Sequence, residues 1–374
     1  MLRFKQFLSE QFLIEEIENN DAKGKLHEIL VAKHLSSDND EDKQLPTHYR
    51  DEKTGKTPRQ IHDKIVNDHM GDQGTNHPDY IEADRRAKEA AEHIKKHLTN
   101  KGHDFSRLSR VAWTSNKSDH EKFTGEGDEN SNADVMLHFN AHDHELKTNP
   151  KHPGHYAGIS LKIGKSQPTV KSPGFDTLNR LTKSHHSVTN DILDDHDQNI
   201  ENAGYDREKS DDTNGHQYNK DTGKTKDSEK AYDQADPDRA KLADEHTSNT
   251  LTKLSSHYTN AINNLQKHEV HHLLKSLIAP DTKHPHITSR TLTSDSDNTT
   301  SHHITNPSED FDDHFKKNNY HGYTAVRGSG KGHSIHIHEK KADGTLGRKL
   351  ATIKLKTRAS GPFSGFVTNV QSHI

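Results

Sequence analysis

The chain has 374 residues, of which 27% are hydrophobic and 29% charged, and its mean hydropathy is −1.16. This length allows one large domain or two ordinary ones, and the low hydrophobic share predicts a modest core with long polar insertions. The net charge of −5 excludes uniform coating of nucleic acid or of an anionic membrane. The absence of cysteine excludes disulfides and thiolate metal sites.

No stretch of the sequence approaches the roughly 18–20 consecutive apolar residues that cross a bilayer. The opening residues begin an amphipathic segment that Glu10, Glu15 and Glu16 interrupt, which is unlike a signal peptide. We therefore expect a protein that is neither secreted nor transmembrane, has no membrane partner and is cytoplasmic.

The first hundred residues are predicted to be mainly helical, because their apolar residues recur at steps of three and four. The expected helices cover residues 3–18, 23–35, 57–70 and 78–98. The pattern then changes to short apolar runs, which predict strands at Leu108–Thr114, Ala133–Phe139 and Tyr156–Ile163. The polar segment Asn116–Asn132 is predicted to be a loop, and Ala141–Glu145 a hairpin turn.

A helix is expected after Pro173-Gly174, and a long helix or helical pair over Pro237–Ile278. Residues 287–305 allow one strand, and further strands are expected near residues 322–327, 333–338, 349–356 and 363–370. We expect five consecutive regions: a helical one at 1–104, an α/β core at 105–200, a disordered acidic insertion at 201–235, helices at 236–280 and a basic β-rich region at 281–374.

The candidate catalytic residues lie on two of these predicted strands. Asp134 stands at the mouth of one apolar run, and Ser160 and Lys162 stand two residues apart in the next, so they share a face. Hydrolysis of a phosphodiester needs a divalent ion held by carboxylates, with a cation near the attacking water. If the two strands pair, both side chains reach the same end of the sheet. The side chain of Leu161 points into the core, and its carbonyl could join the metal shell.

Asp134, the 25-residue gap and Ser160-Leu161-Lys162 resemble the PD-(D/E)xK, or restriction-endonuclease-like, nuclease superfamily. The core of that family is a helix, three strands, a helix and a further strand. The resemblance implies an α/β (α+β) fold with a mixed sheet flanked by helices. It also implies an Mg²⁺ or Mn²⁺ ion bound by Asp134 and supported by Glu28 on the first core helix, with Lys162 positioning or deprotonating water. Gln167 resembles a polar residue that some members place beside the site.

Two residues depart from the family pattern. Ser160 stands where the family has its second acid, and Ala133 stands where it has proline. Glu28 or an acid of the 119–129 segment (Asp119, Glu121 or Asp128) would have to compensate, or the fold would be catalytically silent.

Two basic islands suit a localised phosphate-binding surface. Residues 151–190 hold six Lys/Arg against one acid, and residues 321–374 hold nine against two. The residues that we expect to contact DNA are Lys165, Ser166, Lys171, Arg348, Lys349, Lys354, Lys356 and Arg358. The alternation of the C-terminal cations with Leu350, Ile353 and Leu355 predicts a strand with one cationic and one apolar face.

The sequence thus favours an Mg²⁺-dependent DNA endonuclease, whose opening residues resemble those of tailed-phage proteins and allow a location in the host cytoplasm. The main alternative is a non-catalytic phage structural or nucleic-acid-binding protein with the same fold. An unrelated α/β protein with an aspartate at a strand edge and a lysine nearby stays open, as does a homodimer. A zinc hydrolase is disfavoured, because 34 histidines make pairs such as His185-His186 arise by chance. His336 and His338 share a strand face, but Ile335 and Ile337 are expected to face inward, which turns the two histidines to solvent.

Overall fold

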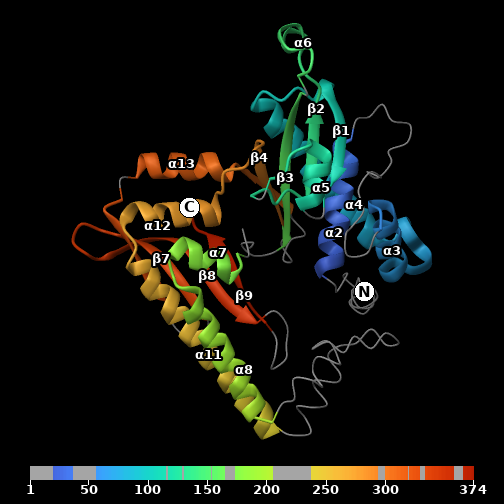
Figure 1. Cartoon of the computed structure of the whole chain (residues 1–374). Helices are drawn as coiled ribbons and strands as arrows, with labels where there is room; N and C mark the ends of the chain where they lie inside the picture. Colours follow the sequence, from blue (N-terminus) through green and yellow to red (C-terminus); the bar gives the residue numbers. More distant parts are fainter. Residues whose placement is uncertain are drawn as a thin grey trace, which may run out of the picture. The chain divides into compact units, whose positions relative to one another are not determined.

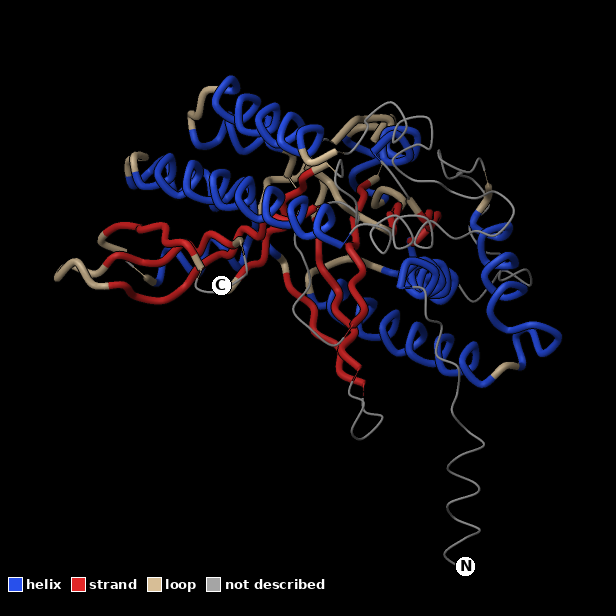
Figure 2. The backbone as a smooth tube through the Cα atoms, turned by 90° about the horizontal axis from the view of Figure 1, so that it is seen from below, coloured by secondary structure: helices blue, strands red, loops and turns tan. Residues whose placement is uncertain are grey.

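The computed structural model describes residues 20–36, 56–114, 117–128, 130–152, 154–164, 173–204, 237–293, 300–318, 320–328, 333–357 and 365–374. The chain is a mixed α/β protein that divides into two compact units (Figures 1 and 2). Unit 1 comprises Met1–Pro168 and Asp281–Pro307, and unit 2 comprises Thr169–Pro280 and Ser308–Ile374. This division differs from the consecutive regions expected, because residues 281–307 belong with the N-terminal part.

Unit 1 begins with three helices, α2 (Asn20–Leu35), α3 (Pro58–Met70) and α4 (Pro78–Asn100), which confirm three of the predicted helices. Thr57 caps α3 in a reciprocal bond with Gln60, and both α3 and α4 start on a proline, whose missing N–H costs nothing there. Short 3₁₀ turns follow at Gly71–Asn76 (η1) and Phe105–Arg107 (η2). The apolar side of α2 is almost completely buried against α4 and the sheet.

Sheet A of unit 1 contains β1 (Leu108–Trp113), β2 (Val135–Phe139), β3 (His155–Gly164), β4 (His286–Thr293) and β5 (Thr300–Thr305). The strands lie in that order, and only β3 and β4 are parallel. A parallel pair requires a long crossover, and here the chain leaves after Gly164 and returns at His286. The crossover contains most of the helices of unit 2.

The two faces of sheet A bury different side chains, because neighbouring residues of a strand point in opposite directions. Val135, Leu137 and Ile159 are fully buried in the core that includes α2 and α4. On the opposite face, Met136 packs with Phe123 of α5 (Lys117–Thr124). By the same alternation, Ser160 and Lys162 lie on the α5 face, whereas Leu161 lies on the α2 face, as expected.

Two local predictions were wrong. The segment Asn116–Asn132 is not all loop, since it contains α5, a polar helix that buries Asp119, His120 and Phe123 on its inner side. The expected hairpin turn contains α6 (Asp143–Thr148), whose start is stabilised by a reciprocal bond between His142 and Glu145. In both segments charged residues form the helix, and so few apolar residues remain to mark its period.

Unit 2 contains α7 (Phe175–Thr182), α8 (His186–Asn202), α11 (Pro237–Asn263), α12 (Lys267–Ile278) and α13 (Pro307–Lys317). Its antiparallel sheet B has the order β6 (Gly322–Arg327), β7 (Ser334–Lys340), β8 (Leu346–Thr357) and β9 (Phe366–Ser372). The helix after Pro173-Gly174, the helical pair and the C-terminal strands were therefore predicted correctly. Helices α8 and α11 run side by side (Figure 1).

One face of sheet B is covered by α11 and α12. Ile335, Ile337, Ile353 and Val370 are fully buried there in one core with the apolar residues of both helices. None of the described helices of the chain is both long and apolar enough to cross a membrane. The expected helix at 3–18 and nearly all of the expected insertion at 201–235 lie outside the described residues.

A glycine in β3 is required by the close approach of its neighbours. A Cβ added at Gly158 would lie 2.9 Å from His286 Nδ1, 3.1 Å from Ala133 Cβ and 3.3 Å from Met136 Sδ. We predict that Gly158→Ala lowers the free energy of unfolding by about 1–3 kcal/mol, measured by urea denaturation. Gly24→Ala in α2 is the control, because no atom lies within 4 Å of its added Cβ. Gly24→Ala should raise the free energy of unfolding by up to about 1 kcal/mol, and equal effects at the two sites would contradict the packing argument.

Candidate functional site

The site forms around Asp134, which directly precedes β2. Its backbone is fixed on both sides, since Asp134 N–H donates to Ile159 O (2.8 Å) and its carbonyl accepts from Thr114 N–H (2.9 Å). The preceding carbonyl, of Ala133, accepts from Thr114 Oγ1 (2.7 Å) and from His120 Nε2 (2.8 Å). The aspartate therefore projects from a rigid backbone rather than from a free loop end.

The carboxylate of Asp134 accepts hydrogen bonds from three consecutive residues of β3. The donors to its Oδ2 are Leu161 N–H (2.6 Å), Ser160 Oγ (3.3 Å) and Lys162 Nζ (3.4 Å). Asp134 and Lys162 thus meet as the sequence predicts. Ser160 is fully buried, and its hydroxyl helps to orient the carboxylate of Asp134. The side chains of Asp134 and Lys162 are 21% and 29% exposed, so a ligand can reach them.

Glu28 of α2 belongs to the same site. Its Oε2 accepts a hydrogen bond from Trp113 Nε1 at the end of β1 (2.9 Å), and its carboxyl interacts electrostatically with Asp134 and Lys162. Burial, reinforced by the negative charge of Asp134, raises the pKa of Glu28 to about 8. Trp113 is 2% exposed, so it is a core side chain that orients Glu28.

The second carboxyl of the pair is also hard to ionise. Burial raises the pKa of Asp134 above its usual range, although the ammonium of Lys162 and the N–H of Leu161 oppose that rise. Among the described residues, no hydrogen bond reaches Asp134 Oδ1 or Glu28 Oε1. Two neighbouring carboxyls with raised pKa values and two open oxygens suit a divalent cation, which would favour their charged forms.

Other predicted site residues are not brought to Asp134 by the described structure. Gln167, Lys165, Ser166, Lys171 and Arg358 lie outside the described residues. The acids of the 119–129 segment do not replace the missing one. Asp128 accepts from the backbone N–H groups of Asn130, Ser131 and Lys283 and so holds its loop, Asp119 lies on the inner side of α5, and Glu121 is exposed.

The predicted cations of the C-terminal region lie on β8 in unit 2. Lys354 and Lys356 are exposed, and Lys349 is partly exposed. Arg348 departs from the predicted cationic face, because its guanidinium acts on His314 and Tyr320, which belong to the helix-covered side. These residues and Asp134 therefore belong to different units.

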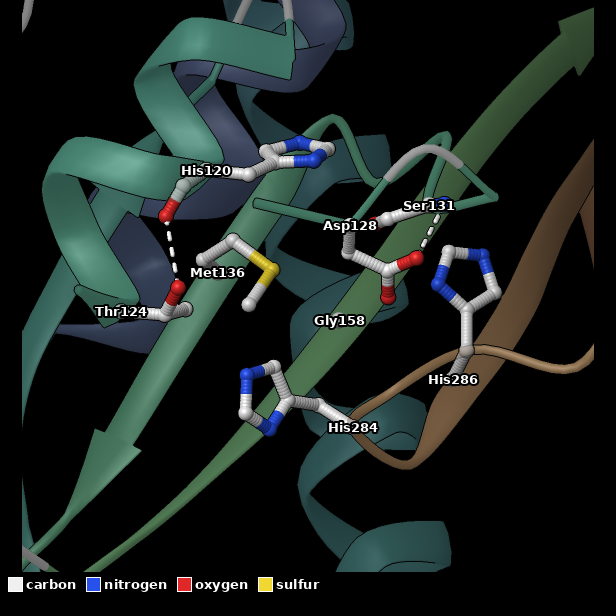
Figure 3. A pocket seen from close by; sticks show the side chains of 8 residues that line it. All are labelled: His120, Thr124, Asp128, Ser131, Met136, Gly158, His284 and His286. Carbon is white, nitrogen blue, oxygen red and sulfur yellow. Dashed lines mark hydrogen bonds between the residues drawn. The ribbon is translucent and has the colours of Figure 1, made fainter. Parts of the chain in front are cut away.

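A second polar group lies on the α5 face of sheet A, around a cavity of about 10 Å³ (Figure 3). His120, Asp128, His284 and His286 surround Met136 and Gly158 there. No described residue bonds His284 Nε2, His286 Nε2 or His120 Nδ1, and the cavity has the size of one water molecule. Sequence analysis missed these residues, because no spacing distinguishes them from the other histidines.

No group of three or more His, Asp or Glu side chains within the described ranges has metal-binding geometry. The candidate site therefore offers two carboxylates rather than a closed ligand cage. Comparison with protein-family models, curated proteins and solved structures finds no match for this chain.

Removing the charge of Glu28 should stabilise the protein. Its folded-state pKa of about 8 exceeds the ordinary glutamate value of 4.5, so the folded state binds more protons between these pH values, and stability falls as pH rises through them. Glu28→Gln keeps an oxygen for Trp113 but cannot ionise. We predict that it raises the free energy of unfolding at pH 8 by at least about 1 kcal/mol, with the gain shrinking towards pH 4.5.

Urea denaturation at both pH values measures this effect. Glu92→Gln, at an exposed position of α4, is the matched control and should change little at either pH. A Glu28→Gln variant that is no more stable than this control at pH 8 would refute the electrostatic description of the site.

Acid should destabilise the protein through its buried histidines. Burial lowers the pKa of His286 from 6.5 to about 4 and that of His27 to about 3. The unfolded state then binds more protons, so stability is lost as pH falls from 6.5 towards 4, by about 1.4 kcal/mol per pH unit for each histidine. We predict that His286→Gln flattens this dependence in urea titrations. His69→Gln, at an exposed position of α3, should leave the dependence of unfolding free energy on pH unchanged. An equally steep dependence in both variants would contradict the role given to His286.

Proposed function

We propose that the chain is an Mg²⁺- or Mn²⁺-dependent nuclease that hydrolyses phosphodiester bonds of DNA. The observation that carries this proposal is the ion pair of Asp134 with Lys162 at a partly exposed point of sheet A, within electrostatic reach of Glu28 on α2. Two partly buried carboxyls with raised pKa values beside an amine are unfavourable without a cation, so the arrangement is better explained by ligand chemistry than by stability.

The donor set fits magnesium better than zinc. Magnesium takes oxygen ligands, keeps several waters and is commonly held by one or two carboxylates together with substrate phosphates. Asp134 Oδ1 and Glu28 Oε1 are the oxygens that would hold it, and the carbonyl of Leu161 is a further candidate. When bound, the ion would neutralise the phosphate and lower the pKa of a water molecule.

The residues of the chain have separate roles in this proposal. Lys162 supplies a positive charge beside Asp134 and would position the attacking water or take up its proton. Ser160 and the N–H of Leu161 fix the orientation of the aspartate, and Trp113 does the same for Glu28. Ser160 cannot act as a second acid, so the metal would depend on Glu28 more than in the family pattern.

The order of elements in unit 1 agrees with the resemblance in part. Helix α2 precedes β1, β2 and β3, and β4 completes the sheet beside β3. The helix that the family has between its third and fourth strands is replaced by the crossover through unit 2. We keep DNA as the proposed substrate because the resemblance points to it.

A non-catalytic DNA-binding or phage structural role is the second candidate. It is favoured by the three donors that already satisfy Asp134 Oδ2, and by the serine in place of an acid. A hydrogen-bonded aspartate of this kind also stabilises the pairing of β2 with β3 without any catalysis.

Incubation of the purified full chain with plasmid DNA and Mg²⁺ tests the proposal. We predict that the wild type cleaves the plasmid, that EDTA abolishes cleavage, and that Asp134→Ala and Lys162→Ala each reduce the rate by on the order of 10²–10⁴-fold. Asp72→Ala and Lys151→Ala remove the same charges at exposed positions of unit 1 and should leave the rate unchanged. Equal residual cleavage in all variants would reveal a contaminant, and no cleavage by a folded wild type would favour the non-catalytic role.

A further inference from the structure

The face of sheet B opposite α11 and α12 is polar and cationic. Cross-strand partners point to the same face, so the pairing of the strands defines its members. They are Thr324 and Val326 of β6; Ser334, His336 and His338 of β7; Lys349, Thr352, Lys354 and Lys356 of β8; and Val367, Asn369, Gln371 and His373 at β9. The described strands contribute no Asp or Glu to this face.

A β-bulge in β8 places Lys349 beside the other cations. Residues 349 and 354 are an odd number of positions apart, so a regular strand would point them in opposite directions. The register between β7 and β8 shifts between Ile337 and His338, and Lys349 pairs with His338. In consequence, Lys349 and Lys354 both act electrostatically on His336 and on His373.

The acids nearest to this face in the sequence are directed elsewhere. Glu339 pairs with Tyr323, which packs in the helix-covered core, and it acts on Tyr320. Asp343 lies in the turn between β7 and β8 and accepts from the N–H and hydroxyl of Thr345. The positive charges of Lys349 and Lys354 are therefore not neutralised by either of these two acids.

We propose that this face of sheet B binds the phosphate backbone of double-stranded DNA, and that its histidines strengthen the binding as pH falls. The three lysines lie along β8, with His336 and His338 on β7 to one side and His373 after β9 on the other, rather than gathered in a hollow. Such spacing fits a polyanion with many phosphates better than a single small anion. DNA binding here does not require that the site at Asp134 cleaves.

Two histidines of this face, His336 and His373, have pKa values lowered from that of a free histidine. Burial, Lys349, His338 and Lys354 hold the pKa of His336 below 6.5, and burial with the same lysines and both β7 histidines does so for His373. Ser334 and Thr352 contact His336 and His373 through hydrogen bonds, and β6 faces them with uncharged Thr324 and Val326. A phosphate would favour the protonated form of each histidine, so DNA binding and proton uptake should be linked.

Fluorescence anisotropy with a duplex oligonucleotide in EDTA measures binding without cleavage. We predict that the full chain binds with salt-dependent affinity, and that Lys349→Gln with Lys354→Gln weakens binding and reduces the log–log salt slope by about 2. Lys316→Gln with Lys317→Gln removes the same charge from exposed positions of α13 and should bind as the wild type does. The proposal is overturned if the Lys349/Lys354 double variant binds DNA as tightly as the Lys316/Lys317 control, or if the control loses as much affinity as the β8 variant.

A second variant tests the role of the histidines. His336→Gln with His338→Gln should bind like the wild type at pH 7.5 but lose most of the wild type's gain in affinity at pH 5.5. Circular dichroism confirms that each variant is folded. A wild type with the same affinity at both pH values refutes the histidine part. If the wild type does not cleave plasmid DNA but still binds the duplex in EDTA, the proposed nuclease activity is rejected and the proposed DNA-binding face of sheet B is supported.

Discussion

The geometry of the candidate site depends on one carboxylate oxygen, Asp134 Oδ2. Asp134 Oδ2 accepts from the backbone of Leu161 and from the side chains on either side of it, so the aspartate, the lysine and the serine are fixed by the pairing of β2 with β3. A shift of that register by one residue would turn Ser160 and Lys162 to the α2 face. The buried Ile159 and Leu161 oppose such a shift, because it would turn them out of the core that includes α2. The hydrophobic core therefore maintains the polar geometry.

Holding the carboxyls of Glu28 and Asp134 near each other is electrostatically unfavourable, and the packing of unit 1 offsets this cost. Glu28 and Asp134 are like charges in a poorly hydrated place, and Lys162 can offset only one of them. Trp113 and the buried side of α2 keep Glu28 from moving away to water. Strain of this kind is common where a ligand completes a site and is otherwise selected against.

The sequence predicts the parts of this fold that depend on local periodicity and misses those that depend on distant pairing. Ser160 and Lys162 were placed on one face because strand alternation is strict, and α2, α3 and α4 were found from their apolar stripes. Helix α5 was missed because its buried inner side includes Asp119 and His120, which look like solvent-facing residues in a sequence. The bond between Trp113 and Glu28 joins residues 85 positions apart, and no local pattern encodes it.

The same limit explains why the sequence does not predict that residues 281–307 group with the N-terminal unit, and this grouping has a consequence for folding. Residues 281–307 complete sheet A only after the chain has passed through α7 to α12, so β3 and β4 pair across more than a hundred residues. Pairing at such a separation is slow, because the chain loses the entropy of loop closure before any β3–β4 contact forms to offset that loss. Sheet A thus depends on unit 2 being compact enough to bring its two ends together. We expect the packing of α8 against α11 and of α7 against α12, whose contacts span fewer residues, to form first and to shorten that loop. On this view the insertion is part of how the candidate site is assembled, because the strand that bears Lys162 has its β4 partner only when the crossover is closed.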